Sequence, residues 1–295
     1  MKAVVFDGPR SVSIQDRPVP QIQDDEDIIV KVSATALCGS ELHVYRGHQP
    51  STTGFIMGHE FTGTVRRLPH HETSAAISKA PPSISDEALI LMADIFPTGF
   101  FGVKSALSLA PPTLNIQEST LVVIGCGPVG LCAIVAAAEQ KPKHLFAIDG
   151  VDSRLEQARQ LGAEPLNFLS DKAGMMARIL EATGGRGADL VVEVVGLSPA
   201  LRTAFDIVRP FGVISSIGVH NAEIPWSGSE AYGKNIRLQM GRCPVRSIFS
   251  EALVLLEKKQ HLLGFMFENI MPLNEAVQGY TLFDEMKVQK VVFKP

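Results

Sequence analysis

One segment combines a buried strand, a glycine-rich turn and a helix, and it constrains the fold more than any other part of the chain. An uninterrupted apolar run at 121–124 leads directly into the turn at 125–130, and an apolar helical pattern continues to about residue 140. In such a turn the first glycine allows the tight bend, the second lets the backbone approach a pyrophosphate, and the third lets helix and strand pack closely. The helix N-terminus then offers its free N–H groups to the phosphates. The segment predicts a dinucleotide site whose turn residues are Gly125, Gly127, Pro128, Val129 and Gly130.

An acidic residue at the end of the next predicted strand indicates which dinucleotide binds. Asp149 lies nineteen residues after Gly130 and closes an apolar run at 144–148. A carboxylate at this spacing can accept hydrogen bonds from the adenosine ribose hydroxyls, and it would repel a 2′-phosphate. The sequence therefore favours NAD over NADP, although Arg154 could bind such a phosphate. An ordinary α/β sheet that uses glycines only for turns is disfavoured, because strand, glycines, helix and acidic residue occur together.

Alternating strands and helices surround this unit from about residue 119 to 241. Strands separated by helices of this length require right-handed crossovers, which produce a parallel, doubly wound Rossmann sheet. The region before residue 61 consists instead of short strand patterns broken by turn residues, and a last strand is predicted at 288–293. The predicted fold class is thus α/β. The strands expected in the Rossmann sheet are 120–124, 144–148, 189–195, 213–217 and 236–240.

Cysteine, histidine and carboxylate residues in the first third of the chain form a second informative pattern. Cys38, His59 and Asp94 can hold Zn²⁺ through a thiolate, an imidazole and a carboxylate, with a fourth position left for water or substrate. Ser40 and His43 follow the cysteine closely, so a hydroxyl could take a proton from an alcohol and pass it through the cofactor ribose to an imidazole. Joined to a hydride cofactor, this set indicates Lewis-acid-assisted oxidation of an alcohol.

Composition and charge exclude several other classes of function. The chain has 295 residues, which is enough for about two globular domains, and its net charge of −4 provides no basic field for nucleic acid or an anionic membrane. No apolar run reaches transmembrane length, and the N-terminus lacks the features of a signal peptide. The four cysteines include no C-x-x-C pair, which argues for a reducing compartment, the cytoplasm. A small molecule is therefore the expected partner.

These motifs together resemble the zinc-containing medium-chain alcohol dehydrogenases. The resemblance rests on C-G-S-E-L-H at 38–43, G-H-E-F-T-G at 58–63, A-D-I-F-P-T-G at 93–99 and the glycine turn with Asp149. It covers nearly all of the chain outside 66–79. It is greatest with the branch that has aspartate as the third zinc ligand, which includes glutathione-independent formaldehyde dehydrogenases and fungal relatives.

The resemblance implies a role for each matched residue and a limit for each domain. The implied ligands of one catalytic zinc are Cys38, His59, Asp94 and, as a transient or outer ligand, Glu60. The implied catalytic residues are Ser40, His43, Glu60 and, near the nicotinamide, Thr98. The resemblance further implies a Rossmann domain at 102–245, a catalytic GroES-like β-barrel domain at 1–101 that is completed by 246–295, and a homo-oligomer formed through edge strands of the Rossmann domain.

The chain departs from the family pattern between residues 66 and 79. Family members continue there through further barrel strands and a lobe with four closely spaced cysteines that hold a structural zinc, whereas this segment has no C-x-x-C spacing. The sequence thus predicts a truncated GroES-like barrel without a structural zinc, in which missing strands uncover apolar surface and sheet edges. Both a natural variant with a reduced barrel and a lost segment replaced by unrelated residues remain open. His70 and His71, within this segment, are predicted to be solvent-exposed.

The predicted function is hydride transfer between NAD and a zinc-bound primary or secondary alcohol or aldehyde. Two alternatives remain: a non-catalytic dinucleotide-binding protein whose barrel is too damaged for turnover, and a metal-free NADPH-dependent reductase on the same scaffold. The triplet of cysteine, histidine and aspartate argues against the reductase. Arg242 and Lys290 could reach the cofactor phosphates or lie in solvent.

Overall fold

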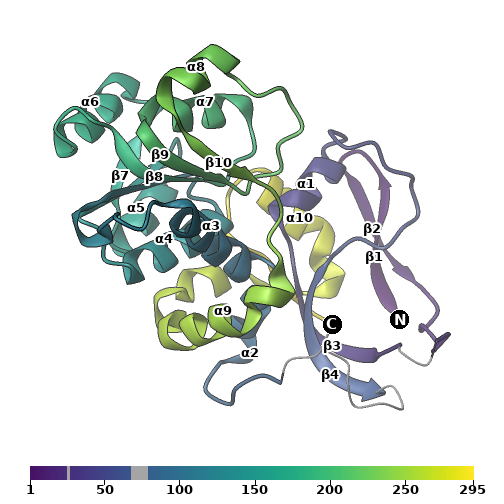
Figure 1. Ribbon diagram of the computed structural model, residues 1–295. Helices are drawn as coiled ribbons and strands as arrows, with labels where there is room; N and C mark the ends of the chain where they lie inside the picture. The colour runs from purple at the N-terminus through teal and green to yellow at the C-terminus, as the bar shows by residue number, and fades with distance from the viewer. Residues whose placement is uncertain (25–26, 68–78) are drawn as a thin grey trace. The chain divides into compact units, whose positions relative to one another are not determined.

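The structure is a computed structural model that describes residues 1–24, 27–67 and 79–295 (Figure 1). The predicted exposure of His70 and His71 therefore lies outside the described residues. The chain forms two compact units. Unit 1 consists of Met1–Asp94 and Leu256–Pro295, and unit 2 consists of Ile95–Leu255. The catalytic and cofactor-binding roles assigned to 1–101 with 246–295 and to 102–245 stay predictions.

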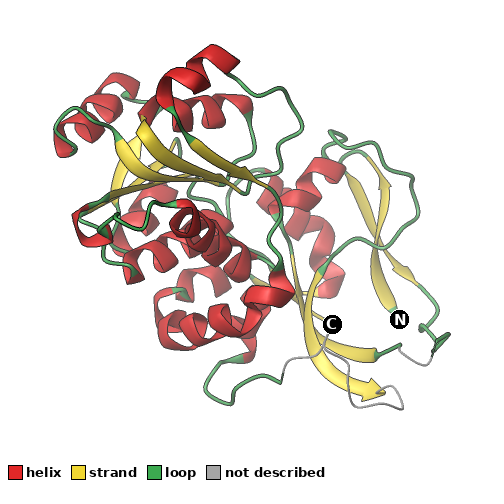
Figure 2. Cartoon of the chain, in the orientation of Figure 1, coloured by secondary structure: helices red, strands yellow, loops and turns green. Residues whose placement is uncertain are grey.

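Unit 2 is built on a six-stranded parallel sheet with the order β10-β9-β8-β5-β6-β7. Helices cover both of its faces, with α6, α7 and α8 on one side and α3, α4 and α5 on the other (Figure 2). The predicted parallel, doubly wound sheet is confirmed. The strands are β5 (Thr120–Ile124), β6 (His144–Asp149), β7 (Glu164–Asn167), β8 (Ala188–Glu193), β9 (Val208–Ser216) and β10 (Arg237–Met240). The helices are α3 (Ile95–Leu109), α4 (Pro128–Glu139), α5 (Asp152–Gln160), α6 (Lys172–Ala182), α7 (Ser198–Ile207) and α8 (Gly228–Lys234), and α9 (Val245–Lys259) follows the sheet.

Burial on both faces explains why the central strands are continuous apolar runs. All residues of β5 and β8 are buried, as expected for a parallel sheet covered by helices on both sides. The sequence did not predict β7, since its four residues include Pro165 and lack a continuous apolar run. Proline is compatible with this strand because β7 is the last strand of the sheet.

Unit 1 contains two small sheets. β1 (Lys2–Gly8) pairs antiparallel with β2 (Ser11–Asp16), and the described residues form a four-stranded sheet of order β11-β12-β3-β4. The C-terminal strand β12 pairs antiparallel with β3, so the end of the chain completes a sheet begun near its start. The remaining strands are β3 (Ile29–Ala36), β4 (Glu60–Arg67), β11 (Ile270–Pro272) and β12 (Val292–Lys294), and the helices are α1 (Gly39–Tyr45), α2 (Asp86–Leu89) and α10 (Ala276–Asp284).

Among the described residues, no single helix has both the length and the apolar character needed to cross a membrane. The bent pair Asp86–Ala93 and Ile95–Leu109 meets these two criteria only when its members are taken together.

Candidate metal and cofactor sites

The predicted metal-binding side chains meet at one place in unit 1. Ligand atoms of Cys38, His59, Glu60 and Asp94 all lie within 4.8 Å of one another. Cys38 Sγ is 3.0 Å from Asp94 Oδ2, and His59 Nε2 is 3.4 Å from the same oxygen. A thiolate, an imidazole and carboxylates are donors that suit Zn²⁺, so the residues fit the ion that the motif predicts.

Strand pairing explains how Cys38 and His59 come together. β3 and β4 are antiparallel with Ala36 opposite Glu60, so the two ligands lie just beyond neighbouring strand ends. Gly58 precedes His59 with a φ of +111°, a conformation that glycine adopts without a steric penalty.

A capping interaction fixes the start of α1 behind the cysteine. Cys38 is the N-cap residue, and its backbone N–H donates to Glu41 Oε2 at 2.9 Å. The Tyr280 hydroxyl donates to the other oxygen of Glu41 at 3.4 Å. Burial raises the pKa of Glu41. These contacts hold the loop that carries Cys38 in place. Asp94 directly follows the 3₁₀ turn Ile90–Ala93.

Glu60 is held by Lys290, which the sequence did not place in the site. Both side chains are fully buried, and Lys290 Nζ lies 2.7 Å and 2.6 Å from the two carboxylate oxygens of Glu60. Lys290 Nζ also donates to the carbonyl oxygen of Leu37 at 2.8 Å, so each of its three hydrogens has an acceptor. Burial is the largest single influence and opposes the charge, but Glu60, Cys38 and Asp94 together outweigh it and raise the pKa of Lys290. Whether Glu60 is a transient or an outer ligand of the metal stays a prediction.

The two roles considered for Lys290, phosphate contact and solvation, are both wrong. The residue lies immediately before the buried run Val291–Phe293, and a lysine in such a position requires an acidic partner in the core. The apolar residues after Lys290 were the only local indication in this segment that the lysine is buried. Its partner could not be identified locally, because Glu60 lies 230 residues away in the sequence.

The surroundings of His59 and Cys38 favour the protonated forms of both side chains. Asp94 and Cys38 raise the pKa of His59 to about 11, and burial raises the pKa of the Cys38 thiol. A metal ion must displace these protons, because only thiolate and neutral imidazole are ligands.

Ser40 and His43 lie three residues apart on α1, which places them on one face of the helix. The Ser40 hydroxyl donates to Cys38 Sγ at 3.2 Å, so it adjoins the ligand cluster. Burial and the neighbouring His48 and Arg46 lower the pKa of His43, which keeps its imidazole neutral near pH 7. His43 is therefore able to accept a proton.

The glycine turn in unit 2 has the geometry that the sequence predicts. Gly125 has a φ of +95°, and a Cβ on Gly130 would lie 1.7 Å from the carbonyl oxygen of Gly125. A Cβ on Gly127 would meet no atom of the described residues within 4 Å, which leaves room for a close ligand. Pro128 begins α4 directly after this open position, so the turn and the helix N-terminus fit a pyrophosphate.

Asp149 ends β6 directly below the turn. Its Oδ2 accepts the backbone N–H of Cys126 at 2.7 Å, and its Oδ1 accepts those of Gly150 and Val151 at 2.8 Å and 2.9 Å. The carboxylate therefore supports the turn, and Oδ2 keeps capacity for a further hydrogen bond.

The remaining predicted residues lie in unit 2. Arg154 is half-buried on α5, and Thr98 is half-buried in the first turn of α3. The predicted contact of Thr98 with the nicotinamide stays a prediction.

Comparison with known proteins identifies the family. A zinc-binding dehydrogenase model matches residues 128–258, and an alcohol dehydrogenase GroES-like domain model matches residues 24–79. Zinc-type alcohol dehydrogenase B of Aspergillus flavus is 50% identical over 350 aligned positions, which cover all of this chain and 81% of that protein. The chain belongs to the zinc-type medium-chain alcohol dehydrogenases. It is therefore an oxidoreductase of the zinc-dependent alcohol dehydrogenase type, and the GroES-like match confirms the predicted class of the N-terminal domain.

Other relatives agree with the assignment to the zinc-type alcohol dehydrogenases. The medium chain reductase/dehydrogenase ucsI of Acremonium sp. is 47% identical over 79% of this chain and 98% of that protein. Among solved structures, alcohol dehydrogenase TADH from Thermus sp. ATN1 has a TM-score of 0.90 and 28% identity, with both chains covered completely. Zinc dependent alcohol dehydrogenase 2 from Streptococcus pneumonia, at 24% identity and a TM-score of 0.86, shares the fold, with 100% of this chain and 98% of that chain covered.

Proposed function

We propose that this chain is a zinc-dependent, NAD-linked dehydrogenase of primary or secondary alcohols and the corresponding carbonyl compounds. The observation that carries the proposal is the convergence of Cys38, His59 and Asp94 ligand atoms within 4.8 Å. Zinc bound there supplies a Lewis acid that lowers the pKa of the substrate hydroxyl, and NAD supplies the hydride acceptor. Small-molecule alcohols are the substrate class that the family implies.

Ser40 and His43 are proposed to carry the alcohol proton away from the reacting centre. The Ser40 hydroxyl lies 3.2 Å from Cys38 Sγ, so it is close enough to the ligands to take a proton from an alcohol bound beside them. His43 is neutral near pH 7 and half-buried, so it can accept the proton and release it to solvent. Glu60, which is paired with Lys290, is proposed to be an outer residue of the metal site that adjoins the three ligands.

The glycine turn and Asp149 are proposed to hold NAD. The turn leaves the space in front of Gly127 open, and α4 begins at that point. The negative charge of Asp149 suits ribose hydroxyls and opposes a 2′-phosphate. Arg154 remains the residue that would favour NADP if it turned towards a phosphate.

We also propose that the protein is a homo-oligomer formed through the edge of the Rossmann sheet. The strand β10 forms the edge of the sheet opposite β7, and its side chains Leu238 and Met240 are exposed within the chain. Size-exclusion chromatography with light scattering tests this proposal, and a monomer at micromolar concentration would refute it.

Zinc stoichiometry and NADH binding, measured together on the purified protein, test the main proposal. We expect about one zinc per chain, saturable NADH binding and chelator-sensitive oxidation of alcohols. Replacing Cys38 or His59 should remove the zinc and leave NADH binding intact, whereas Cys243→Ser, which changes a thiol in unit 2, should retain both. A protein that binds NADH without zinc or turnover would support the non-catalytic alternative. Activity with NADPH after chelation would support the metal-free reductase.

A further inference from the structure

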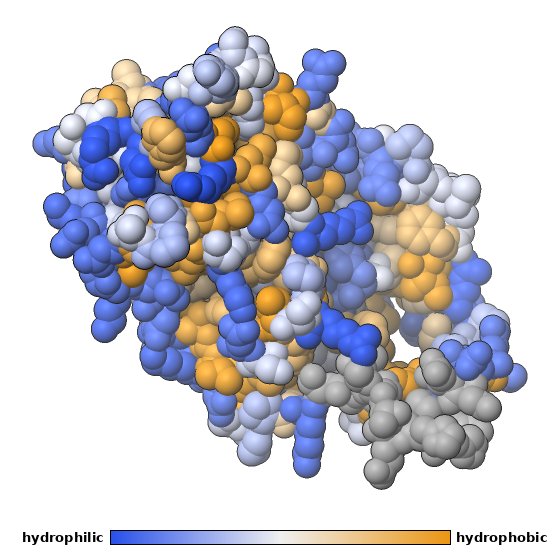
Figure 3. Space-filling model, in the orientation of Figure 1, coloured by the Kyte–Doolittle hydropathy of each residue, from blue (hydrophilic) through white to orange (hydrophobic). Residues whose placement is uncertain are grey.

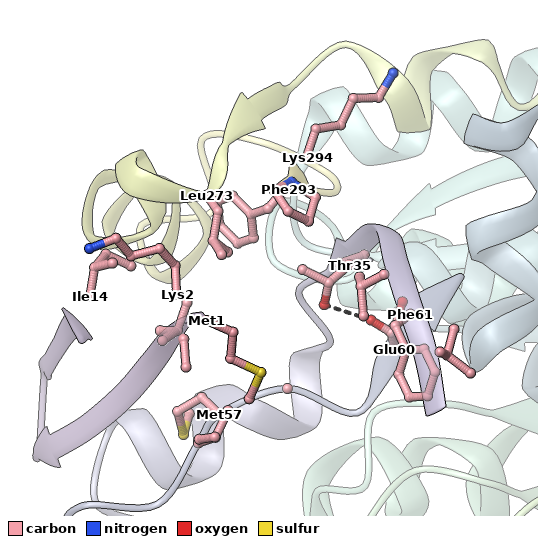
Figure 4. A pocket seen from close by; sticks show the side chains of 18 of the residues that line it. Met1, Lys2, Ile14, Thr35, Met57, Glu60, Phe61, Leu273, Phe293 and Lys294 are labelled. Atoms are coloured by element: carbon pink, nitrogen blue, oxygen red, sulfur yellow. Dashed lines mark hydrogen bonds between the residues drawn. The ribbon is translucent and has the colours of Figure 1, made fainter. Parts of the chain in front are cut away.

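Unit 1 contains a cavity of about 990 Å³ that borders the candidate metal site through Glu60. Its walls come from β1, β2 and β3 and from the C-terminal segment that includes Leu273 and Phe293 (Figure 4). Cys38, His59 and Asp94 are not among the described residues that line it. The volume lies at the upper end of the range of small-molecule pockets.

The cavity lies in the unit in which the sequence predicts missing barrel strands. The relative from Aspergillus flavus aligns over 350 positions and this chain has 295 residues, so at least 55 aligned positions have no counterpart here. Apolar side chains are correspondingly visible on the surface over β1 and β2, beside a hollow (Figure 3). An apolar hollow of this size loses packing contacts unless a ligand fills it.

Apolar side chains form most of the wall. Val4, Met57 and Phe293 are buried residues on different segments, and Val30 and Val32 add the β3 side of the wall. Such a surface holds ordered water poorly, because a buried water needs two to four polar partners. The walls therefore favour a hydrocarbon chain.

The polar groups at the inner end already have partners within the protein. The Thr35 hydroxyl donates to the backbone oxygen of Glu60 at 2.7 Å, and the Glu60 side chain is bound by Lys290. Glu41 accepts from the hydroxyl of Tyr280 and from a backbone N–H. With these acceptors satisfied, the inner end offers little to a polar group, so the apolar end of a ligand would enter first.

The rim of the cavity is cationic. Lys31 and Arg66 are exposed on the neighbouring strands β3 and β4, and Lys2 and Lys294 also line the opening. Lys2 and Lys294 contact Asp16 and Glu87, at 2.6 Å and 2.9 Å. Lys31 and Arg66 are therefore the better positioned cations for an anionic head group, by charge complementarity.

We propose that this cavity binds a long-chain carboxylate of the fatty-acid class, with its hydrocarbon chain between β1, β3 and the C-terminal segment and its carboxylate at Lys31 and Arg66. The cavity adjoins the proposed reaction site through Glu60, but none of Cys38, His59 and Asp94 lines it. Because Glu41, Gly58 and Glu60 line the cavity and adjoin the metal ligands, an occupied cavity also supports the wall behind the metal site.

Displacement of fluorescent cis-parinaric acid from the zinc-loaded protein tests the proposal. We expect palmitate to displace the probe, and methyl palmitate, which has the same chain without the charge, to displace it about fivefold less well, as for a solvent-exposed ion pair. Val32→Trp, which fills the cavity, should weaken probe binding by at least about tenfold through lost chain burial. Val277→Trp, on an exposed position of α10 outside the lining, should not.

Three outcomes separate the parts of the proposal. If the parent protein does not bind the probe, or if Val32→Trp binds it as well as the parent does while keeping parental zinc content and circular dichroism, the cavity is not the site. Equal displacement by palmitate and methyl palmitate would overturn the anionic head group. Lys31→Glu changes only an exposed side chain and should weaken palmitate but not methyl palmitate, which keeps the test valid if Val32→Trp does not fold. None of these readouts depends on dehydrogenase activity.

Discussion

Replacing Lys290 by methionine would leave the Glu60 carboxylate buried without the cation that now contacts both of its oxygens. Neither side chain is exposed to solvent, so water cannot replace the lost ammonium group. Removing one partner of a buried ion pair typically costs about 3–5 kcal/mol, and we expect a decrease of this size in the free energy of unfolding of unit 1. Lys294→Met is the matched control: its ion pair with Glu87 is partly exposed on both sides, and such pairs contribute about 0–1 kcal/mol.

The pH dependence of the Lys290→Met variant distinguishes loss of charge from loss of packing. In the parent protein the pKa of Lys290 is raised, so its contribution is fully present below the unfolded value near 10.5 and is lost only as the pH rises through the folded value. Burial already raises the pKa of Glu60 in the parent protein, where Lys290 opposes the shift. Without Lys290 the pKa should rise further, so the destabilising effect of the buried carboxylate is largest at alkaline pH and declines as the pH falls towards 4.5. The stability deficit should therefore be larger at pH 8 than at pH 5.5.

Denaturant unfolding of the chelator-treated protein measures this deficit without a contribution from zinc. The chain has one tryptophan, Trp226, which lies in unit 2, so circular dichroism should report the loss in unit 1 while tryptophan fluorescence reports the unit that is not altered. Equal deficits for the Lys290→Met and Lys294→Met variants, or a deficit that does not change with pH, would refute the reasoning. Glu60→Gln combined with Lys290→Met should recover part of the stability, since the buried charge is then removed.

Three further predictions concern the cofactor turn, the metal and the proton relay. Gly130→Ala should destabilise unit 2 by about 1–3 kcal/mol because the new methyl group overlaps a backbone oxygen. Gly127→Ala should instead keep the parental stability and weaken NADH binding. Thermal unfolding and NADH titration measure both effects, and an unaltered melting temperature for Gly130→Ala would contradict the first. Zinc uptake should release protons, because burial raises the pKa of Cys38 and neighbouring groups raise the pKa of His59 to about 11. Calorimetry in buffers of different ionisation enthalpy measures this release. A binding heat that is the same in all buffers would contradict the prediction. Ser40→Ala should lower turnover by about 10²–10⁴-fold at unchanged zinc content, and a parental rate would remove Ser40 from the relay.

Local motifs were sufficient to predict five of the six strands of the Rossmann sheet and the residues of the metal cluster. The turn at 125–130 requires three glycines for steric reasons that act within a few residues, and an apolar run before it and an apolar helix after it complete the unit. The cluster of Cys38, His59 and Asp94 was predicted from residue types that suit zinc, and the structure brings their ligand atoms together. Such features can be recognised without knowing any distant contact.

Lys290 and the cavity of unit 1 depended on contacts between distant parts of the chain. The partner of Lys290 lies on β4, and the two meet only because β12 pairs with β3, which in turn pairs with β4. The cavity likewise depends on how β1, β3 and the C-terminal segment pack around a space, and β7 forms a strand because β6 offers it a neighbouring edge. Residue types specify which chemistry is available, but the burial that gives a lysine or an apolar wall its role arises only when separate segments pack together.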